Sequence, residues 1–489
     1  MQYSHNRDAV FTKSSDELYT LINIFSEQDL LTALYDYFQK RYSLPQGVVK
    51  QGIKRSIASS YIYRKASFSK ELSLGWILVS MLKHLGALFY AFIHCRKLIN
   101  KGCYKLIVDG IASVIEFERF KELIDLFGKE NVLIITTSEA VIARYPSYNI
   151  EAVSRLKHCD IHQVLRSLLY ECMSGIWLYI SLSIKLRMNL FYAVTPLVMS
   201  YIHHTSLFMM FKADFIIQER HYGTNSIKNY LFKKSGGCYS TTIQKNILQM
   251  DTMNYYIDTD ILFSLGNRTA DLAFEYGGRI GRVIPVGSMF MEYYWFKNPA
   301  NVEKKIDVVM LGINVMNAYE RLDSYSKFMD DYYESIRWLV RFKKENPSYR
   351  VVIKHHASAG RDEIEEKIIS GSGVEMLARV GNSYEIAFGS RCAVTYGSTM
   401  GYELNAHGVP TFFLDPGYRC TILTDGNEQL LKGLRVASYE AFSDMVLNVL
   451  NNSDTGKTLS LNNSDDLCLN SAEVSRRIYS ALMQQADQG

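Results

Sequence analysis

The chain has 489 residues, a formal net charge of +4, 48% hydrophobic and 21% charged residues. This length exceeds what one core supports and fits two or three domains, and the composition excludes a disordered chain. The weakly basic balance gives no ground for a nucleic-acid partner. Eight cysteines without a CxxC pair argue against a zinc knuckle or a disulfide framework and indicate a reducing, cytoplasmic compartment. The polar N-terminal residues predict no signal peptide.

Two largely apolar stretches lie in the first half, at 74–93 and 176–211. Lys83 and His84 interrupt the first stretch, and two basic residues interrupt the second. Because a charge at the middle of a bilayer is costly, we predict no membrane span and interpret both stretches as core helices. The alternative is peripheral contact with an anionic membrane surface, since basic residues flank the first stretch.

The first half is predicted to form one parallel sheet after a helical start. Helices are expected at 17–25, 27–41 and after Lys70. Long apolar strands alternating with helices are typical of a parallel sheet covered on both faces. The expected strands and helices that follow are strand 104–109, helix 115–127, strand 131–136, strand 213–217, strand 260–266, helix 267–276 and strand 282–287.

The second half repeats this pattern. A strand at 306–312, a helix at 324–345 and a strand at 349–354 precede three β/α steps near 375, 392 and 411, and 471–485 is a helix. The sequence therefore predicts an α/β protein of two doubly wound domains that hold a ligand between them, at the carboxyl ends of their strands. The predicted boundaries are 1–288 for the first domain with its helical start, 289–305 for a linker, 306–470 for the second domain and 471–489 for a C-terminal helix.

A small-residue turn near the C-terminal end is the strongest candidate for a ligand site. A strand ends before Gly397, Ser398 and Thr399, and a helix follows. Unpaired backbone N–H groups and the positive end of the helix dipole suit a phosphate at such a turn. Two hydroxyls add donors, and Glu403 is placed to accept hydrogen bonds from a ribose. The site implied is one for a nucleotide monophosphate or diphosphate.

Basic residues end another strand of the second half. Lys354, His355 and His356 follow Val351–Ile353, one β/α unit before the turn. At the carboxyl end of a parallel strand they are expected to face the same phosphate. The alternative is one histidine that caps a turn and one that is solvated. Backbone amides around Gly312 and Asn314 are further candidates for nucleotide contact, or a plain β-to-α loop.

An acid at a strand end of the first half is the candidate base. Glu219 follows the strand at 213–217, with Arg220 and His221 beside it. We predict Glu219 and His221 as catalytic residues, with Glu219 taking the proton of an acceptor hydroxyl. The alternative is a structural salt bridge between Glu219 and Arg220. Asp109 is a second candidate acid, although an Asp-Gly turn is the favoured interpretation of it.

In order along the chain, these motifs resemble GT-B glycosyltransferases of bacterial surface-polysaccharide assembly. The chain is similar to capsule Kdo transferases, bacterial polysialyltransferases and, more distantly, CDP-glycerol glycerophosphotransferases. In that group a strand leads to a His-Pro pair. In this chain residues 353–356 occupy the corresponding position, and His356 replaces the proline. The turn at 397–403 matches the Ser/Thr-rich turn and its Glu-bearing helix, and 218–223 resembles the acid-to-glycine motif with a longer spacing. The resemblance covers about residues 210 to 420.

The resemblance implies a GT-B fold and a metal-independent, cytoplasmic enzyme, at the inner face of the plasma membrane if it contacts lipid. It implies transfer from a nucleotide-sugar donor, without a further cofactor, to a glycan or glycolipid acceptor. The nearest families indicate a CMP-activated nonulosonic acid or Kdo-type sugar and inversion at the anomeric carbon. The alternatives are a UDP- or GDP-sugar donor, glycerol-phosphate transfer from CDP-glycerol, and a non-catalytic assembly partner.

Overall fold

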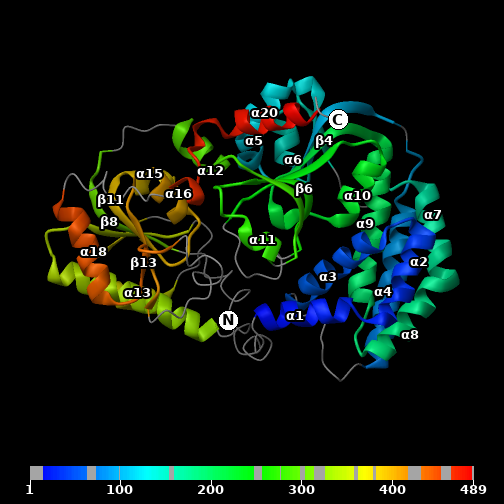
Figure 1. The fold of residues 1–489 in the computed structure, drawn as a ribbon, viewed down its shortest axis with the longest axis horizontal. Coiled ribbons are helices and arrows are strands. Elements are labelled where there is room, and N and C mark those ends of the chain that lie inside the picture. Colours follow the sequence, from blue (N-terminus) through cyan, green and yellow to red (C-terminus); the bar gives the residue numbers. More distant parts are fainter. Residues whose placement is uncertain are drawn as a thin grey trace.

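Two α/β lobes lie side by side, with the N-terminal helices gathered at the far edge of the first lobe (Figure 1). The structure is a computed structural model. It describes residues 15–62, 73–98, 100–152, 159–246, 256–275, 277–297, 303–312, 325–356, 362–377, 381–416, 431–452 and 464–486.

The first lobe is built on a seven-stranded, all-parallel sheet in the order β3-β2-β1-β4-β5-β6-β7. Its strands are β1 (Gly102–Ile111), β2 (Val132–Thr136), β3 (Asn149–Ala152), β4 (Phe211–Gln218), β5 (Tyr239–Ile243), β6 (Asp258–Ser264) and β7 (Arg279–Pro285). Successive residues point to opposite faces, so Leu106 and Val108 enter one core and Ile107 the other. An apolar strand buried on both faces results.

Helices cover both faces of this sheet. Those of the first lobe are α1 (Ser15–Ser26), α2 (Thr32–Tyr42), α3 (Gln46–Ile62), α4 (Leu74–Ile93), α5 (Val114–Phe127), α6 (Glu139–Arg144), α7 (Ile161–Tyr170), α8 (Ile176–Leu186), α9 (Phe191–Met210), α10 (Ser226–Lys234) and α11 (Asp271–Glu275). The N-terminal helices, α9 and α10 pack on one face. The other face is covered by α5.

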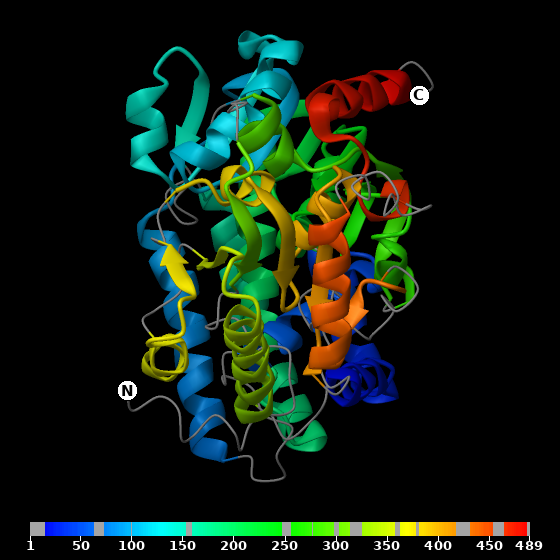
Figure 2. The same ribbon diagram turned by 90° about the vertical axis from the view of Figure 1, so that its left-hand side faces the viewer.

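The second lobe holds a six-stranded parallel sheet in the order β10-β9-β8-β11-β12-β13. Its strands are β8 (Ile306–Leu311), β9 (Val351–Lys354), β10 (Glu375–Leu377), β11 (Ser390–Thr395), β12 (Thr411–Leu414) and β13 (Arg435–Val436). Its helices are α13 (Tyr325–Glu345), α14 (Glu363–Ile369), α15 (Ser383–Phe388), α16 (Met400–Ala406), α18 (Tyr439–Asn451) and α19 (Ser464–Leu467). Figure 2 shows α13 and α18 in front of the sheet, and their apolar residues form one core with it.

Two segments tie the lobes together. Residues 289–296, expected to lack regular structure, form α12 (Met289–Met291) and a π-helical turn (Glu292–Phe296), and they pack on the second sheet. The last helix, α20 (Val474–Ala486), returns to the first lobe and lies beside α5 (Figure 1). Two Rossmann-like domains joined in this way form the predicted GT-B fold. The boundaries at 288, 305 and 470 remain predictions.

The expectation of core helices holds for α9 and is wrong for much of α4. In α9, twelve residues are buried. In α4 only one narrow face is buried, and large apolar side chains such as Trp76, Leu82 and Phe89 are about 60% exposed. Within the described ranges, two apolar segments, Leu74–Ile93 and Ile161–Leu186, are long enough to cross a membrane by length and composition, with 28% and 39% of the apolar window buried.

Candidate functional site

In each sheet the order of the strands changes direction at one point, which we call the reversal. In the first lobe this point lies between β1 and β4, and in the second between β8 and β11. Both strand orders are those of a Rossmann fold, in which ligands bind outside the carboxyl ends of the strands at this reversal. Glu219 directly follows β4, and Gly312 and the 397–399 turn follow β8 and β11. Glu219, Gly312 and the 397–399 turn therefore stand at the reversals, whereas Lys354, His355 and His356 lie at the end of β9, one strand away.

In the second lobe, Gly312, the basic residues that follow β9 and the 397–399 turn lie at the carboxyl ends of neighbouring strands. Leu311 is in register with Lys354 on one side and with Thr395 on the other. Because neighbouring strands lie about 4.8 Å apart, the backbones of Lys354 and Thr395 are about 10 Å apart. The Gly312 N–H donates to the Lys354 carbonyl at 2.9 Å, and a Cβ added at Gly312 would lie 3.2 Å from His355 Cα. Asn314 lies outside the described residues.

Hydroxyl groups of its own residues hold the 397–399 turn. Gly397 adopts φ +85°, a conformation that favours glycine. The Ser398 N–H donates to Thr395 Oγ1 at 3.2 Å, and the Met400 N–H donates to Ser398 Oγ at 3.3 Å. Two backbone donors that the sequence led us to expect unpaired are thus satisfied internally. Ser398 Oγ accepts a hydrogen bond here, so its own hydrogen remains available to a ligand.

The two neighbouring histidines have different surroundings. His355 is buried, and its Nε2 lies 2.9 Å from Glu365 Oε1 of α14, a carboxylate that also accepts from Tyr332 at 3.4 Å. His356 is exposed beyond the carboxyl end of β9. Partial burial of its ring and the nearby Lys354 ammonium both lower the pKa of His356. A ligand at the carboxyl end of β9 therefore meets the His356 ring more readily than the His355 ring.

Lys354 and Glu365 both contact His355 at the carboxyl end of β9. The Lys354 ammonium is buried and donates to the His355 carbonyl at 3.2 Å, and burial lowers its pKa. Glu365 was not among the predicted site residues. Its only sequence signal is the acidic run that starts α14, where Asp362 Oδ1 accepts from the N–H groups of Ile364 and Glu365.

Glu403 lies at the joint between the lobes. One carboxylate oxygen accepts from Ser288 Oγ, at the start of α12, and the other accepts from Tyr384 OH of α15 at 2.6 Å. Complete burial raises the pKa of Glu403 to about 7, against the lowering effect of both hydroxyls. Nearby, the Ser471 N–H donates to His407 Nε2 at 3.2 Å. The ribose contact predicted for Glu403 remains a prediction, and it requires this buried carboxylate to become accessible.

The first lobe presents a dense charge cluster at its reversal point. Glu219 accepts from Arg220 and, at 3.3 Å, from Lys245 after β5. Arg220 also donates to Glu116 of α5 at 2.6 Å. The Glu219 side chain is 3% exposed. The salt bridge weighed as an alternative is therefore present, and a role as base requires Glu219 to release a cation when the acceptor enters.

The other two candidates of this lobe are held by neighbouring groups. His221 is buried, and its Nδ1 accepts from the Lys245 N–H at 3.1 Å, so the neutral ring carries its hydrogen on Nε2. Asp109 accepts from Lys228 of α10 at 2.6 Å. Both side chains fix the loops around Glu219. Their catalytic roles remain predictions.

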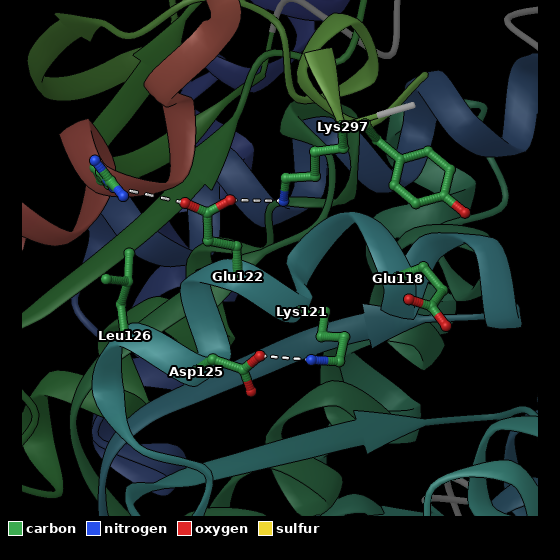
Figure 3. Close-up of a pocket in the computed structure, with 8 residues that line it drawn as sticks. Glu118, Lys121, Glu122, Asp125, Leu126 and Lys297 are labelled. Carbon is green, nitrogen blue, oxygen red and sulfur yellow. Dashed lines mark hydrogen bonds and ion pairs between the residues drawn. The ribbon is translucent and has the colours of Figure 1, made fainter. Parts of the chain in front are cut away.

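A pocket between α5, the π-helical turn and α20 is lined by compensating charges. Figure 3 shows Lys297 and Lys121 turned toward Glu122 and Asp125. The Lys297–Glu122 distance is 2.8 Å and the Lys121–Asp125 distance is 2.6 Å. Because these charges pair with each other, the pocket offers no net charge to a ligand. We interpret it as part of the contact between α20 and the first lobe.

No protein-family model and no curated protein matches this sequence. Among solved structures, the chain is similar to the S. aureus MnaA-UDP co-structure, with 10% identity, a TM-score of 0.45, and coverage of 78% of this chain and 97% of that one. It is similar to UDP-GlcNAc 2-epimerase from Neisseria meningitidis bound to UDP-GlcNAc, with 10% identity, a TM-score of 0.44, and coverage of 78% of this chain and 100% of that one. A Thermobaculum terrenum O-GlcNAc transferase mutant is similar at 11% identity and a TM-score of 0.40, covering 96% of this chain and 84% of that one. Similarity at this level assigns no activity to the chain.

Proposed function

We propose that this chain is a metal-independent glycosyltransferase that moves a sugar from a nucleotide donor onto a bacterial surface glycan or glycolipid. One observation carries the proposal: the carboxyl ends of the central strands of the two sheets hold complementary chemistry. The second lobe offers Lys354, His356 and a hydroxyl-lined turn, and the first offers the carboxylate of Glu219.

The second lobe binds the nucleotide and stabilises its leaving phosphate. Lys354 and His356 supply positive charge or hydrogen-bond donors, and Ser398 supplies a hydroxyl hydrogen. Charged donors placed where negative charge develops lower the barrier to departure of a phosphate. This arrangement gives side chains the task that a bound metal ion performs elsewhere.

The first lobe activates the acceptor. Glu219 takes the proton of the acceptor hydroxyl as that oxygen forms a bond to the anomeric carbon and the bond from this carbon to the nucleotide oxygen breaks. Attack from the face opposite the leaving group inverts the configuration. Arg220 and Lys245 pair with the Glu219 carboxylate until the acceptor displaces one of them.

Donor choice follows from the motif resemblance. We propose a CMP-linked nonulosonic acid or Kdo-type acid sugar as the first candidate and a UDP- or GDP-linked sugar as the second. Transfer of glycerol phosphate from CDP-glycerol and a non-catalytic assembly role are the remaining alternatives. The exposed apolar face of α4 supports a place at the inner surface of the plasma membrane.

Incubation with CMP-, UDP-, GDP- and CDP-linked donors tests the proposal. We expect slow hydrolysis of one donor class, which Lys354→Met abolishes while retaining the apolar stem. Lys344→Ala on α13, an exposed lysine of the same lobe, is the matched control and keeps full activity. Hydrolysis of none of the donors contradicts the proposal.

A further inference from the structure

A second cavity lies in the first lobe, away from the reversal points. It occupies about 790 Å³ between α3, α4, α9 and the loop that leads into α10. This volume is in the range of small-molecule sites in proteins. The loop that forms its floor, 223–225, begins four residues after Glu219. A molecule held here is therefore held against the same loop that carries the candidate base.

The lining of this cavity is basic and rich in hydroxyl groups. Arg55 of α3 and Lys83 of α4 line it, and among the residues that the structure describes the lining contains no Asp or Glu. Seven serine and threonine side chains contribute hydroxyls. Two basic side chains in the cavity wall favour an anion, and many hydroxyls favour a partner that itself bears hydroxyls.

Arg55 is held in place by the loop. Its guanidinium donates to the Tyr222 carbonyl and, at 3.1 Å, to Thr224 Oγ1. Burial lowers the pKa of Arg55 to about 10, against the raising effect of Asp258, so the group stays charged at neutral pH. Asp258 lies 3.6 Å from Arg279 and does not line the cavity. Arg55 therefore keeps a fixed positive charge, with remaining N–H groups for a ligand.

A hydrogen-bonded chain orients one cavity hydroxyl from behind. Thr195 Oγ1 lies 2.9 Å from His84 Nδ1, and His84 Nε2 lies 3.1 Å from Glu171. Glu171 also accepts from three tyrosine hydroxyls. Because an ionised carboxylate only accepts hydrogen bonds, His84 carries a hydrogen on Nε2. The contact with His84 Nδ1 fixes the position of the Thr195 hydroxyl in the cavity wall.

The mouth of the cavity meets the exposed apolar face of α4. Trp76 lines the cavity and is 60% exposed on that face, which continues through Leu82 and Phe89. Helices α7 and α8 extend the apolar surface with Leu169 and Trp177. Helix α4 has no Asp or Glu, and the single acid of 161–186 is buried. An apolar surface with basic residues and no exposed acid fits an anionic bilayer.

We propose that this cavity binds the anionic, hydroxyl-bearing head group of a membrane lipid while the face formed by α4, α7 and α8 lies in the bilayer interface. Arg55 and Lys83 contact the phosphate, the serine and threonine hydroxyls contact the polar remainder, and the acyl chains leave past Trp76. The inference rests on the proposed function in one respect: the bound lipid is then the acceptor or its anchor.

Vesicle binding without nucleotide tests the inference. Wild-type protein is mixed with phosphatidylcholine vesicles with and without phosphatidylglycerol, whose head group carries a phosphate and hydroxyls. We expect binding that depends on phosphatidylglycerol and that falls about tenfold in Arg55→Ala and in Lys83→Ala, the effect of losing one charge-assisted hydrogen bond. Lys344→Ala, which removes the same charge from the second lobe, leaves binding unchanged. Lys83 is exposed, so Lys83→Ala does not depend on Arg55→Ala folding.

Each remaining outcome decides the matter. Equal binding of Lys83→Ala, Arg55→Ala and Lys344→Ala overturns the cavity, because general surface charge then explains the binding. Leu82→Ser should lower binding to phosphatidylglycerol vesicles, and unchanged binding overturns the contact of the α4 face with the bilayer. Tight binding of free glycerol phosphate without vesicle binding overturns a lipid source. The two proposals can fail separately. If vesicle binding depends on Arg55 but no nucleotide sugar is hydrolysed, the proposed glycosyltransferase activity is refuted and the proposed lipid site is not.

Discussion

Glu403→Gln distinguishes a joint between the lobes from a ribose site. The wild-type carboxyl is buried between Ser288 Oγ and Tyr384 OH, so its neutral form fits the surroundings better than its charged form. Glutamine has the same shape and no charge. Its amide oxygen and nitrogen each find one hydroxyl, which accepts or donates as needed. The substitution should therefore keep the joint and remove its dependence on pH.

The magnitude follows from the raised pKa. In the unfolded chain the group titrates near 4.5, and in the folded chain burial raises its pKa to about 7. Between these values the folded state binds more protons, so stability falls as pH rises through this window. The free energy of unfolding should be about 3 kcal/mol lower above pH 7 than below pH 4.5 from this group alone.

Urea unfolding at pH 5 and pH 8 measures the effect as a difference between wild type and Glu403→Gln, so that all other titrating groups cancel. We expect the variant to gain up to about 3 kcal/mol over wild type at pH 8 and much less at pH 5. We also expect its affinity for nucleotide to be unchanged. Parallel loss of stability in both proteins refutes the buried joint, and a large loss of nucleotide affinity supports the ribose role instead.

Four further outcomes are expected. Gly401→Ala should destabilise the protein by about 1–3 kcal/mol in thermal or urea unfolding, because the new Cβ would lie 2.7 Å from the Phe413 ring; an unchanged midpoint contradicts this packing. Lys354→Met and His356→Ala should each weaken nucleotide binding about tenfold in calorimetry, the loss of one hydrogen bond to a charged group, and native affinity in both refutes the site. Glu219→Gln should keep nucleotide binding and lose transfer, whereas unchanged turnover removes Glu219 as base. EDTA should leave activity intact; if it abolishes activity, the metal-independent mechanism is wrong.

The fold was predictable where strands are apolar on both sides. β1, β2, β4, β6, β8 and β11 appear close to their predicted positions because burial on both faces leaves continuous apolar runs. β5 (Tyr239–Ile243) was missed because three of its residues are polar. The hydroxyls of Thr241 and Thr242 donate to backbone carbonyls inside the sheet, and the Ser240 hydroxyl donates to the Asp260 carboxylate. β13 has only two residues and carries no period.

Exposure was the property that the sequence predicted least well. The length and hydropathy of α4 suit a core helix as well as a surface one, and only the packing of α7, α8 and α9 against it decides which residues stay exposed. In the same way, Glu403 follows the turn at the spacing expected for a ligand contact. Its partner Ser288 lies 115 residues earlier, a proximity that no local pattern encodes.

A crystal structure with bound cytidine or uridine nucleotide tests the central claim most directly. We expect the phosphate within hydrogen-bond distance of Lys354 or His356 and of the 397–399 turn, at the carboxyl ends of β9, β8 and β11. A phosphate bound elsewhere, with this site empty, contradicts the claim.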